Sequence, residues 1–223
     1  MASDAKIFFQ SIMDENSQLI DMKMQLHDLF LEAYDKGARI HNDSWGAPTG
    51  SRYTYNYAVV DMFMVEYPEM LIVLAAGNEG VCPPGSGYIG RESLVSPATA
   101  KNALTVGASR SNRMKGGYAD STYGVVYSKR YMLPPTSTDK ISGDAESLAP
   151  FSSRGPCRDD RIKPDIVAPG TDILSTKSSL ASLSQFDGGY DIDKYAFMNN
   201  LFKEISICDS LTAPDRTDSF NVL

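Results

Sequence analysis

The sequence contains few of the residues that most often carry chemistry in enzymes and metal centres. Its 223 residues include two histidines, three cysteines and one tryptophan. The cysteines Cys82, Cys157 and Cys208 form no C-x-x-C pair and are odd in number, which fits neither a zinc site nor a disulfide framework. We therefore expect isolated thiols.

Positive charge and long apolar runs are also scarce. The 21 Lys and Arg residues stand against 28 Asp and Glu residues, giving a net charge of −7 and a pI near 4.8. This balance argues against a nucleic-acid or anionic-membrane partner. The longest apolar run, Met70–Ala76, is far shorter than the ~20 residues of a membrane-spanning helix. Residues 1–10 lack a basic region followed by an apolar stretch, so we expect no secretory signal there and leave the compartment open.

The composition is that of a globular domain, with 42% hydrophobic and 22% charged residues. Apolar spacing in the first half predicts alternating strands and helices. The chain should begin with a strand at Ile7–Ile12 and a helix at Leu19–Ala33 that Gly37 ends. A strand at Ala38–Trp45 follows, and then a helix that has Tyr55, Val59, Met62 and Phe63 on one face and that Pro68 ends. The next strand is expected at Leu71–Ala76. Apolar strands separated by helices indicate a mostly parallel sheet covered on both sides, so the predicted fold class is α/β, doubly wound.

The second half of the chain is less regular. A loop rich in Gly and Pro reaches Pro97, a strand is expected at Ala103–Gly107, and short apolar pieces recur up to Ser175. The stretch from Ser109 to Leu148 is polar and has no clear periodicity, and a loop of that length is usually a surface insertion or functional. No repeat or period continues the fold beyond Tyr195.

Two patterns that look like functional motifs fail on their context. The string Gly85–Gly90 matches G-x-G-x-x-G, but a dinucleotide fingerprint lies directly between a strand and a helix, whereas this string follows two prolines and precedes Pro97. His41, Asp43 and Ser44 do not form a triad, because His41 and Ser44 point to opposite faces of one strand. A triad needs side chains that converge from separate segments.

The strongest local signal is the string Ala75–Gly80, AAGNEG, at the carboxyl end of a buried strand. Ligands of open α/β sheets bind at that end. Asn78 lies near glycines that let a substrate backbone approach, and its side-chain amide can donate a hydrogen bond to a developing oxyanion. The alternative is a structural turn in which Asn78 adopts a left-handed conformation or caps a loop.

Five strings, taken together and in order, resemble the subtilisin-like serine proteases, the subtilases. They are Asn42–Gly46, Ala75–Gly80, Val95–Ala108, Phe151–Pro156 and Lys163–Gly170. A chance match to all five in this order is not credible. The resemblance implies a three-layer α/β/α fold, incomplete here, over residues 1–198, followed by a divergent tail at 199–223 that we expect to be poorly ordered.

The resemblance also assigns roles to the residues that match the family's motifs. It implies that Asn78 is the side-chain donor of the oxyanion hole. The substrate-binding residues would be Ser44, Trp45 and Gly46 on one rim of the cleft, where an extended peptide pairs as an added strand, and Ala75, Ala76 and Gly77 on the opposite wall of the P1 pocket. The partner is then a peptide or protein substrate. In the family a Ser nucleophile attacks the peptide bond, with His as the base and Asp orienting the His.

The family's catalytic Asp, His and Ser motifs have no counterpart in this sequence. The Asp strand and the His helix would precede the segment that matches Asp4–Met13, and after Tyr195–Met198 the chain reads Asn199–Lys203 in place of the nucleophile's Gly-Thr-Ser-Met. We therefore expect a fragment of a subtilisin-like serine endopeptidase that is inactive alone and whose parent would be secreted. The alternatives are a non-catalytic peptide-binding pseudoprotease module and, remotely, a nucleotide-binding α/β protein.

No cofactor or metal is expected from the residues themselves. Subtilases often bind calcium, but no Asp/Asn cluster here has the spacing of a calcium loop. Asp159 and Asp160 are the nearest candidates, and a solvated turn explains them better.

The resemblance makes three structural predictions. The Ser96–Pro97 peptide bond should be cis. The strands at Ala38–Ser44 and Leu71–Ala76 should be parallel neighbours, which places Ser44 and Asn78 at one sheet edge. Without the family's helices that carry the nucleophile and the His, one face of the sheet should be partly uncovered, and the isolated chain should be prone to aggregate.

Overall fold

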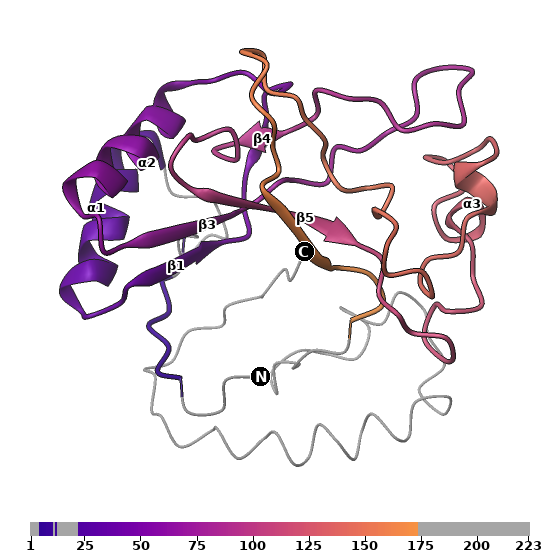
Figure 1. The fold of residues 1–223 in the computed structure, drawn as a ribbon, viewed down its shortest axis with the longest axis horizontal. Coiled ribbons are helices and arrows are strands. Elements are labelled where there is room, and N and C mark those ends of the chain that lie inside the picture. The colour runs from indigo at the N-terminus through magenta and orange to yellow at the C-terminus, as the bar shows by residue number, and fades with distance from the viewer. Residues whose placement is uncertain (1–4, 11, 13–21, 174–223) are drawn as a thin grey trace. The chain divides into compact units, whose positions relative to one another are not determined.

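A computed structural model describes residues 5–10, 12 and 22–173, which Figure 1 draws as a coloured ribbon. The chain divides into two units, Met1–Ile173 and Leu174–Leu223. The second unit lies outside the described residues, so the expected domain end at residue 198 and the expected tail at 199–223 stay predictions. Within the described ranges, no helix is long and apolar enough to cross a membrane.

Four parallel strands form the central sheet (Figure 1). Across the sheet they are β1 (Ile40–Asp43), β3 (Leu71–Ala75), β5 (Leu104–Ser109) and β6 (Ile166–Pro169). A separate antiparallel pair joins β2 (Ala47–Pro48) to β4 (Val95–Ser96). The parallel sheet confirms the α/β class, and the pairing of β1 with β3 confirms the two strands predicted to be neighbours.

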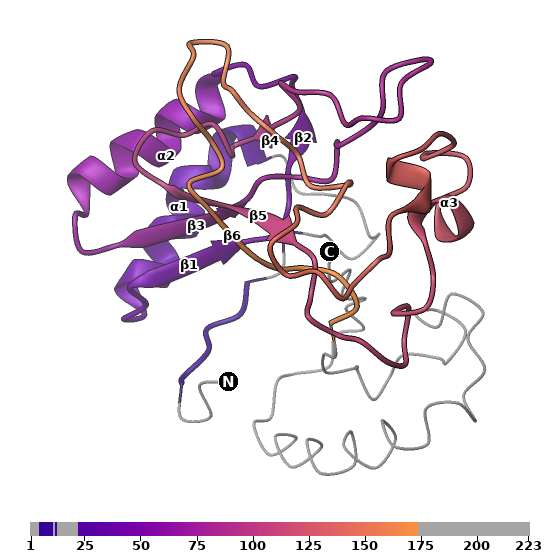
Figure 2. The ribbon, with the colours of Figure 1, turned by 45° about the vertical axis from the view of Figure 1, so that its right-hand side comes forward.

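The two longest helices, α1 (Met22–Asp35) and α2 (Tyr55–Glu66), pack on one face of this sheet, as Figure 2 shows. Buried residues of both helices form a single core with Ile72 and Leu74 of β3. These two side chains point to the same face because residues two apart on a strand do so. The strand therefore contributes one of its two apolar faces to this core.

Both helices end where the sequence predicts. Gly37 has a φ of +93°, and its N–H donates to the Tyr34 carbonyl at 2.9 Å, which closes α1 with a left-handed residue. The last turn of α2 is closed by the N–H of Tyr67, which donates to the Phe63 carbonyl at 2.8 Å. Pro68 follows directly and cannot continue the helix.

The predicted inner face of α2 is wrong in part. Tyr55 and Met62 are 70% and 69% exposed, whereas Asp61 lies on the buried side. Asp61 Oδ1 accepts hydrogen bonds from the backbone N–H groups of Lys101 and Asn102, each at 2.7 Å. Apolar residues surround this helix, so their spacing does not single out a face, and the polar contact of Asp61 decides the orientation.

The strand predicted at Ile7–Ile12 is also wrong where the structure describes it. Residues 5–10 and 12 form no strand, and Ile7 and Phe8 are 87% and 42% exposed. One residue of this segment is bound to α1: Gln10 Nε2 donates to the Leu29 carbonyl at 2.9 Å. A short apolar run becomes a buried strand only where a neighbouring strand pairs with it, and the described part of β1 pairs with β3 alone.

The opposite face of the sheet carries no helix within the described part of the chain. Val106 is in register with Ala75 on one side and with Ile166 on the other, so alternate residues of three strands share this face. Ile166 is 49% exposed and Ile40 is 66% exposed. Among the described residues this face is partly uncovered, as expected without the family's two further helices, whereas the cover on both sides predicted from the apolar strands is not seen there.

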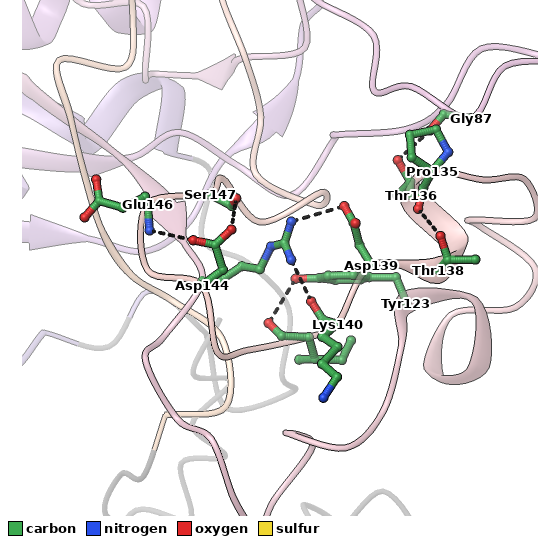
Figure 3. Close-up of polar contacts among 12 residues, drawn as sticks. Gly87, Tyr123, Pro135, Thr136, Thr138, Asp139, Lys140, Asp144, Glu146 and Ser147 are labelled. Atoms are coloured by element: carbon green, nitrogen blue, oxygen red, sulfur yellow. Dashed lines mark hydrogen bonds and ion pairs between the residues drawn. The ribbon is translucent and has the colours of Figure 1, made fainter.

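The polar stretch after β5, here named the connecting segment (residues 110–148), has a core of its own. It contains α3 (Tyr123–Val126) and a short 3-10 helix, η1 (Thr136–Thr138). Tyr123, Tyr131 and Ile141 are buried together. The guanidinium of Arg110 ties the segment to itself by hydrogen bonds, at 3.1 and 3.2 Å, to Asp139 and Lys140, which are labelled in Figure 3. Its order comes from a few large side chains and not from a periodic pattern.

Candidate functional site

Two parallel strands bring the candidate residues to one edge of the sheet. β1 ends at Asp43 and β3 ends at Ala75, and the two strands are neighbours. Ser44 follows the first strand and Asn78 lies just after the second, so both are at the carboxyl edge, as predicted. Ligands of open parallel sheets bind at this edge.

The turn Gly77–Gly80 is fixed by hydrogen bonds to residues 151–153. The Ser153 N–H donates to the Gly77 carbonyl at 2.9 Å, and the Glu79 N–H donates to Ser153 Oγ at 2.9 Å. The Gly80 N–H donates to the Phe151 carbonyl at 3.0 Å. Gly77 has a φ of +109°, whereas Asn78 is outside the left-handed region. The left-handed Asn78 of the alternative interpretation is therefore wrong.

Asn78 itself is half-buried, and its side-chain amide makes no hydrogen bond within the described part of the chain. Its carbonyl oxygen, by contrast, accepts a hydrogen bond from Arg130 Nη2. The backbone of Asn78 is thus held while its amide keeps two N–H donors available. Such an amide can donate to an oxygen of a bound ligand.

The segment after β1 places the first predicted rim. Ser44 and Gly46 are exposed, and Ser44 Oγ accepts a hydrogen bond from Asn42 Nδ2 at 3.3 Å. The indole N–H of Trp45 donates to Asp43 Oδ1 at 3.1 Å, and Asp43 is only 3% exposed. The buried carboxylate therefore orients the Trp45 ring and leaves the rim itself at the surface.

The predicted wall, Ala75, Ala76 and Gly77, continues β3 through backbone hydrogen bonds. The Ala76 N–H donates to the Val106 carbonyl at 2.9 Å, and the Ala76 carbonyl accepts from the Val95 N–H at 3.1 Å. Ala76 of the wall is therefore bonded to both β5 and β4.

The rim and the wall meet on one side chain, that of Val95. A Cβ at Gly46 would lie 2.5 Å from Val95 Cγ2, and a Cβ at Gly77 would lie 2.3 Å from Val95 Cγ1. Both glycines are therefore required for this close packing. The Ser96–Pro97 bond that follows is cis, as predicted.

His41 and Asp43 form a pair, but they face the helices. His41 is in register with Ile72, whose side chain belongs to the helical core, and its ring meets the Phe30 ring edge-on with centroids 5.0 Å apart. His41 Nδ1 lies 3.2 Å from Asp43 Oδ1. The pair lies on the helix-covered face of β1, in keeping with the rejection of a triad at His41, Asp43 and Ser44.

The glycine string Gly85–Gly90 lies in a loop that β4, and not a helix, follows. A Cβ at Gly87 would lie 1.7 Å from the Pro134 carbonyl oxygen, and Thr136 Oγ1 donates to the Gly87 carbonyl at 2.6 Å (Figure 3). Gly87 thus lets the connecting segment approach this loop. The string has a packing role that its similarity to a nucleotide motif does not indicate.

Asp159, the nearest candidate for a calcium ligand, is paired with a cation. Arg161 Nε donates to Asp159 Oδ2 at 2.8 Å, and this hydrogen bond lowers the pKa of Asp159. Among the residues that the structure describes, no group of three or more His, Cys, Asp or Glu side chains is placed to hold a metal ion. Asp159 and Asp160 are both exposed, and whether they bind calcium stays a prediction.

Arg130 and Tyr131 are the residues of this site that the sequence did not indicate. Arg130 Nη2 donates to the carbonyls of Asn78 and Gly80, the latter at 3.1 Å. The Tyr131 hydroxyl donates to the same Gly80 carbonyl at 2.9 Å. Burial raises the pKa of Tyr131 to about 12, so the hydroxyl remains a donor even at a pH at which an exposed tyrosine ionises. No local pattern could have linked these residues to a turn some fifty positions earlier.

Comparison with known proteins agrees with the resemblance. The model of the Subtilase family matches residues 1–205. The serine protease/ABC transporter B family protein tagB of Dictyostelium discoideum is 30% identical over 223 residues, which cover 80% of this chain and 11% of that protein. Pyrolysin of Pyrococcus furiosus is 38% identical over 123 residues, which cover 55% of this chain and 7% of that protein. The chain thus spans only a small part of the length of these relatives.

Among solved structures, the patellamide maturation protease PatA is 22% identical, with a TM-score of 0.43, and the match covers 74% of this chain and 43% of PatA. The prenylagaramide maturation protease PagA is also 22% identical, with a TM-score of 0.40, and the match covers 74% of this chain and 42% of PagA. The family match over most of the sequence, joined to five ordered motifs on a parallel sheet, shows that the chain belongs to the subtilase family.

Proposed function

We propose that this chain is the substrate-binding part of a subtilisin-like serine peptidase domain. It binds an extended peptide between Ser44–Gly46 and Ala75–Gly77 and presents the Asn78 amide to the carbonyl that the parent enzyme would attack. The 223 residues alone bind peptide without hydrolysing it. The observation that carries the proposal is the Asn78 side-chain amide, which has no protein partner among the described residues although its backbone is firmly held.

The binding mode follows from the exposure of the first rim. Ser44 and Gly46 are at the surface, and an extended peptide can add its backbone to such a segment as a further strand. The wall at Ala75–Gly77 consists of small residues, and the backbone of Ala76 is bonded to β4 and β5. In this proposal the substrate side chain lies against that wall. P1 and the scissile carbonyl would then lie next to Asn78.

The chemistry of the site is stabilisation of negative charge. Attack on a peptide carbonyl turns its oxygen into an oxyanion, and a donor that is already oriented stabilises this charge without rearrangement. The family's nucleophile and base are a Ser and a His, whose motifs have no counterpart in this sequence. Loss of both leaves only the residual effect of the oxyanion hole and of binding.

The pseudoprotease alternative shares this site and differs in its parent. A longer transcript that carries the Asp, His and Ser motifs would support a catalytic parent. A full-length transcript that lacks the Asp, His and Ser motifs would support a peptide-binding module that uses the same rims for recognition.

Peptide binding is tested by fluorescence anisotropy with two labelled peptides, one ending in a phosphonic acid and one in a carboxamide. The phosphonate imitates the tetrahedral oxyanion, and the carboxamide is its neutral reference. Asn78→Ala should weaken phosphonate binding about 10-fold or more, because hydrogen bonds to charged groups contribute roughly 1.5–3 kcal/mol, and should leave carboxamide binding unchanged. Asn112→Ala, at an exposed asparagine after β5, is the matched control. Equal losses for both peptides would contradict the oxyanion role.

Hydrolysis is tested on the same protein with internally quenched peptides and a fluorophosphonate probe. We expect no turnover and no labelled serine. A labelled serine with turnover would contradict the inactivity of this chain.

A further inference from the structure

The turn that carries Asn78 is held from two directions, and only one of them lies in a motif that the sequence shares with the subtilases. Residues 151–153 bind the N–H groups of Glu79 and Gly80. The connecting segment binds the carbonyl groups of the same turn through Arg130 and Tyr131. The Asn78 and Gly80 carbonyls are thus bound by a segment outside the family motifs, whereas the Gly77 carbonyl accepts from the Ser153 N–H inside one of them.

Arg130 is suited to hold two carbonyls at once. Its Nη2 donates to the carbonyls of Asn78 and Gly80, so one nitrogen bridges the residues on either side of Glu79. The Arg130 Nε is buried and has no hydrogen-bond partner, so the guanidinium charge is partly removed from water. This desolvation costs free energy, which the two hydrogen bonds to carbonyl groups offset. The Arg130 Cζ also lies 5.5 Å from the centre of the Tyr131 ring, which restricts the guanidinium plane.

The connecting segment is anchored independently of these contacts. Thr136 binds the Gly87 carbonyl through its hydroxyl and its N–H, at 2.6 and 3.2 Å (Figure 3). Cys82 and Ile89, from the loop that follows the turn, pack against the core formed by Tyr123, Tyr131 and Ile141. Arg130 therefore projects from a connecting segment that has its own core and contacts the loop at Cys82, Gly87 and Ile89.

We propose that Arg130 is a positioning residue for Asn78: by binding the carbonyls of Asn78 and Gly80, it fixes the direction in which the Asn78 amide donates. Tyr131 assists at Gly80. The proposal rests on the proposed function in so far as the amide serves an oxyanion, but the restraint on the turn is a property of the free chain. It assigns the connecting segment a role in the site, beyond that of a surface insertion.

The restraint is measured by amide hydrogen exchange of the free protein in solution. The reporters are the Glu79 and Gly80 N–H groups and the two side-chain protons of Asn78. Arg130→Met keeps the aliphatic stem and removes the donor. It should raise the exchange rate of the Glu79 and Gly80 N–H groups about 10-fold. The Tyr131 N–H, which is bonded to the Tyr127 carbonyl at 3.0 Å, should exchange as before. Arg130→Lys should restore part of the protection. Lys129→Met, which removes the neighbouring exposed cation, should have no effect.

Unchanged exchange at Glu79 and Gly80 in Arg130→Met would overturn the proposal. So would an equal rise across the whole connecting segment, because Arg130 would then only stabilise the fold. If Arg130→Met does not fold, Arg130→Gln takes its place, because it removes the guanidinium and keeps a polar side chain. Unchanged exchange at Glu79 and Gly80 in that variant overturns the proposal in the same way.

A binding measurement separates this proposal from the proposed function. Arg130→Met should weaken phosphonate binding more than carboxamide binding, by about 5-fold, because the amide is no longer directed. A wild-type chain that binds neither peptide would refute the proposed function alone, and the exchange rates would still decide whether Arg130 restrains the turn.

Discussion

Replacing Gly77 by Ala tests the packing at the meeting point of rim and wall. The substitution has two separate costs. At a φ of +109° an L-residue is strained, by about 1–2 kcal/mol or more. The new Cβ would also lie 2.3 Å from Val95 Cγ1 and 2.8 Å from Ser153 Oγ, and overpacking of this kind costs about 1–3 kcal/mol. We expect Gly77→Ala to lower the free energy of unfolding by about 2–5 kcal/mol in total.

Gly85 provides the matched control for this substitution. It has a φ of +74°, but a Cβ there would meet nothing within 4 Å. Gly85→Ala should therefore cost only the backbone strain, about 1–2 kcal/mol. Adding Val95→Ala to Gly77→Ala removes the overlap between the new Cβ and the Val95 side chain. The double variant should therefore be more stable, by about 1 kcal/mol, than the sum of the two single variants' losses in the free energy of unfolding predicts.

The measurement is urea unfolding followed by circular dichroism on the four variants and the wild type. Equal destabilisation by Gly77→Ala and Gly85→Ala would refute the close contact with Val95. So would strict additivity of Gly77→Ala and Val95→Ala, because two side chains in contact must show a coupling energy.

Three further predictions concern the buried charge, the pH dependence and the open sheet face. Lys163→Met should lower the free energy of unfolding, measured in urea, by about 3 kcal/mol, because Lys163 Nζ is 4% exposed and lies 2.7 Å from Asp165 Oδ2. An unchanged free energy of unfolding would contradict a structural ion pair. Burial raises the pKa of Tyr131 from 10.0 to about 12, so its stabilising contribution is complete below pH 10 and is lost as the pH rises toward 12; tyrosinate absorbance that appears in full near pH 10 would contradict this. Ile166→Ser should reduce self-association in analytical ultracentrifugation more than Ile162→Ser, whose side chain is 87% exposed in a loop, and equal effects would count against an apolar face as the cause.

The sheet could be predicted from the sequence because its strands are continuous apolar runs with clear ends. Leu71–Ala76 is a short apolar run between Pro68 and Gly77, which favours a strand over a helix, and Gly37 and Pro68 mark helix ends by their backbone properties. Once β1 and β3 are parallel neighbours, Ser44 and Asn78 must share an edge. The left-handed residue of the turn is Gly77, whereas the sequence alone also allowed that conformation for Asn78.

The elements that sequence reasoning missed depend on contacts between distant residues. The orientation of α2 is decided by Asp61 binding the N–H groups of Lys101 and Asn102, which no apolar spacing reveals. The run at Ile7–Ile12 has the residues of a strand but no strand to pair with among those described. Arg130 reaches Asn78 from a segment whose order comes from scattered aromatic residues. Polar contacts of this kind leave no local pattern in a sequence.

The central claim is that the Asn78 amide donates to the negative charge of a bound peptide. Spectra of the Asn78 side-chain ¹H–¹⁵N group, recorded while the phosphonate peptide is added, test it most directly. We expect both of its proton signals to shift, at least one of them downfield, in step with binding, and to stay in place when the carboxamide peptide binds. Saturating phosphonate binding with unmoved Asn78 signals would contradict the account.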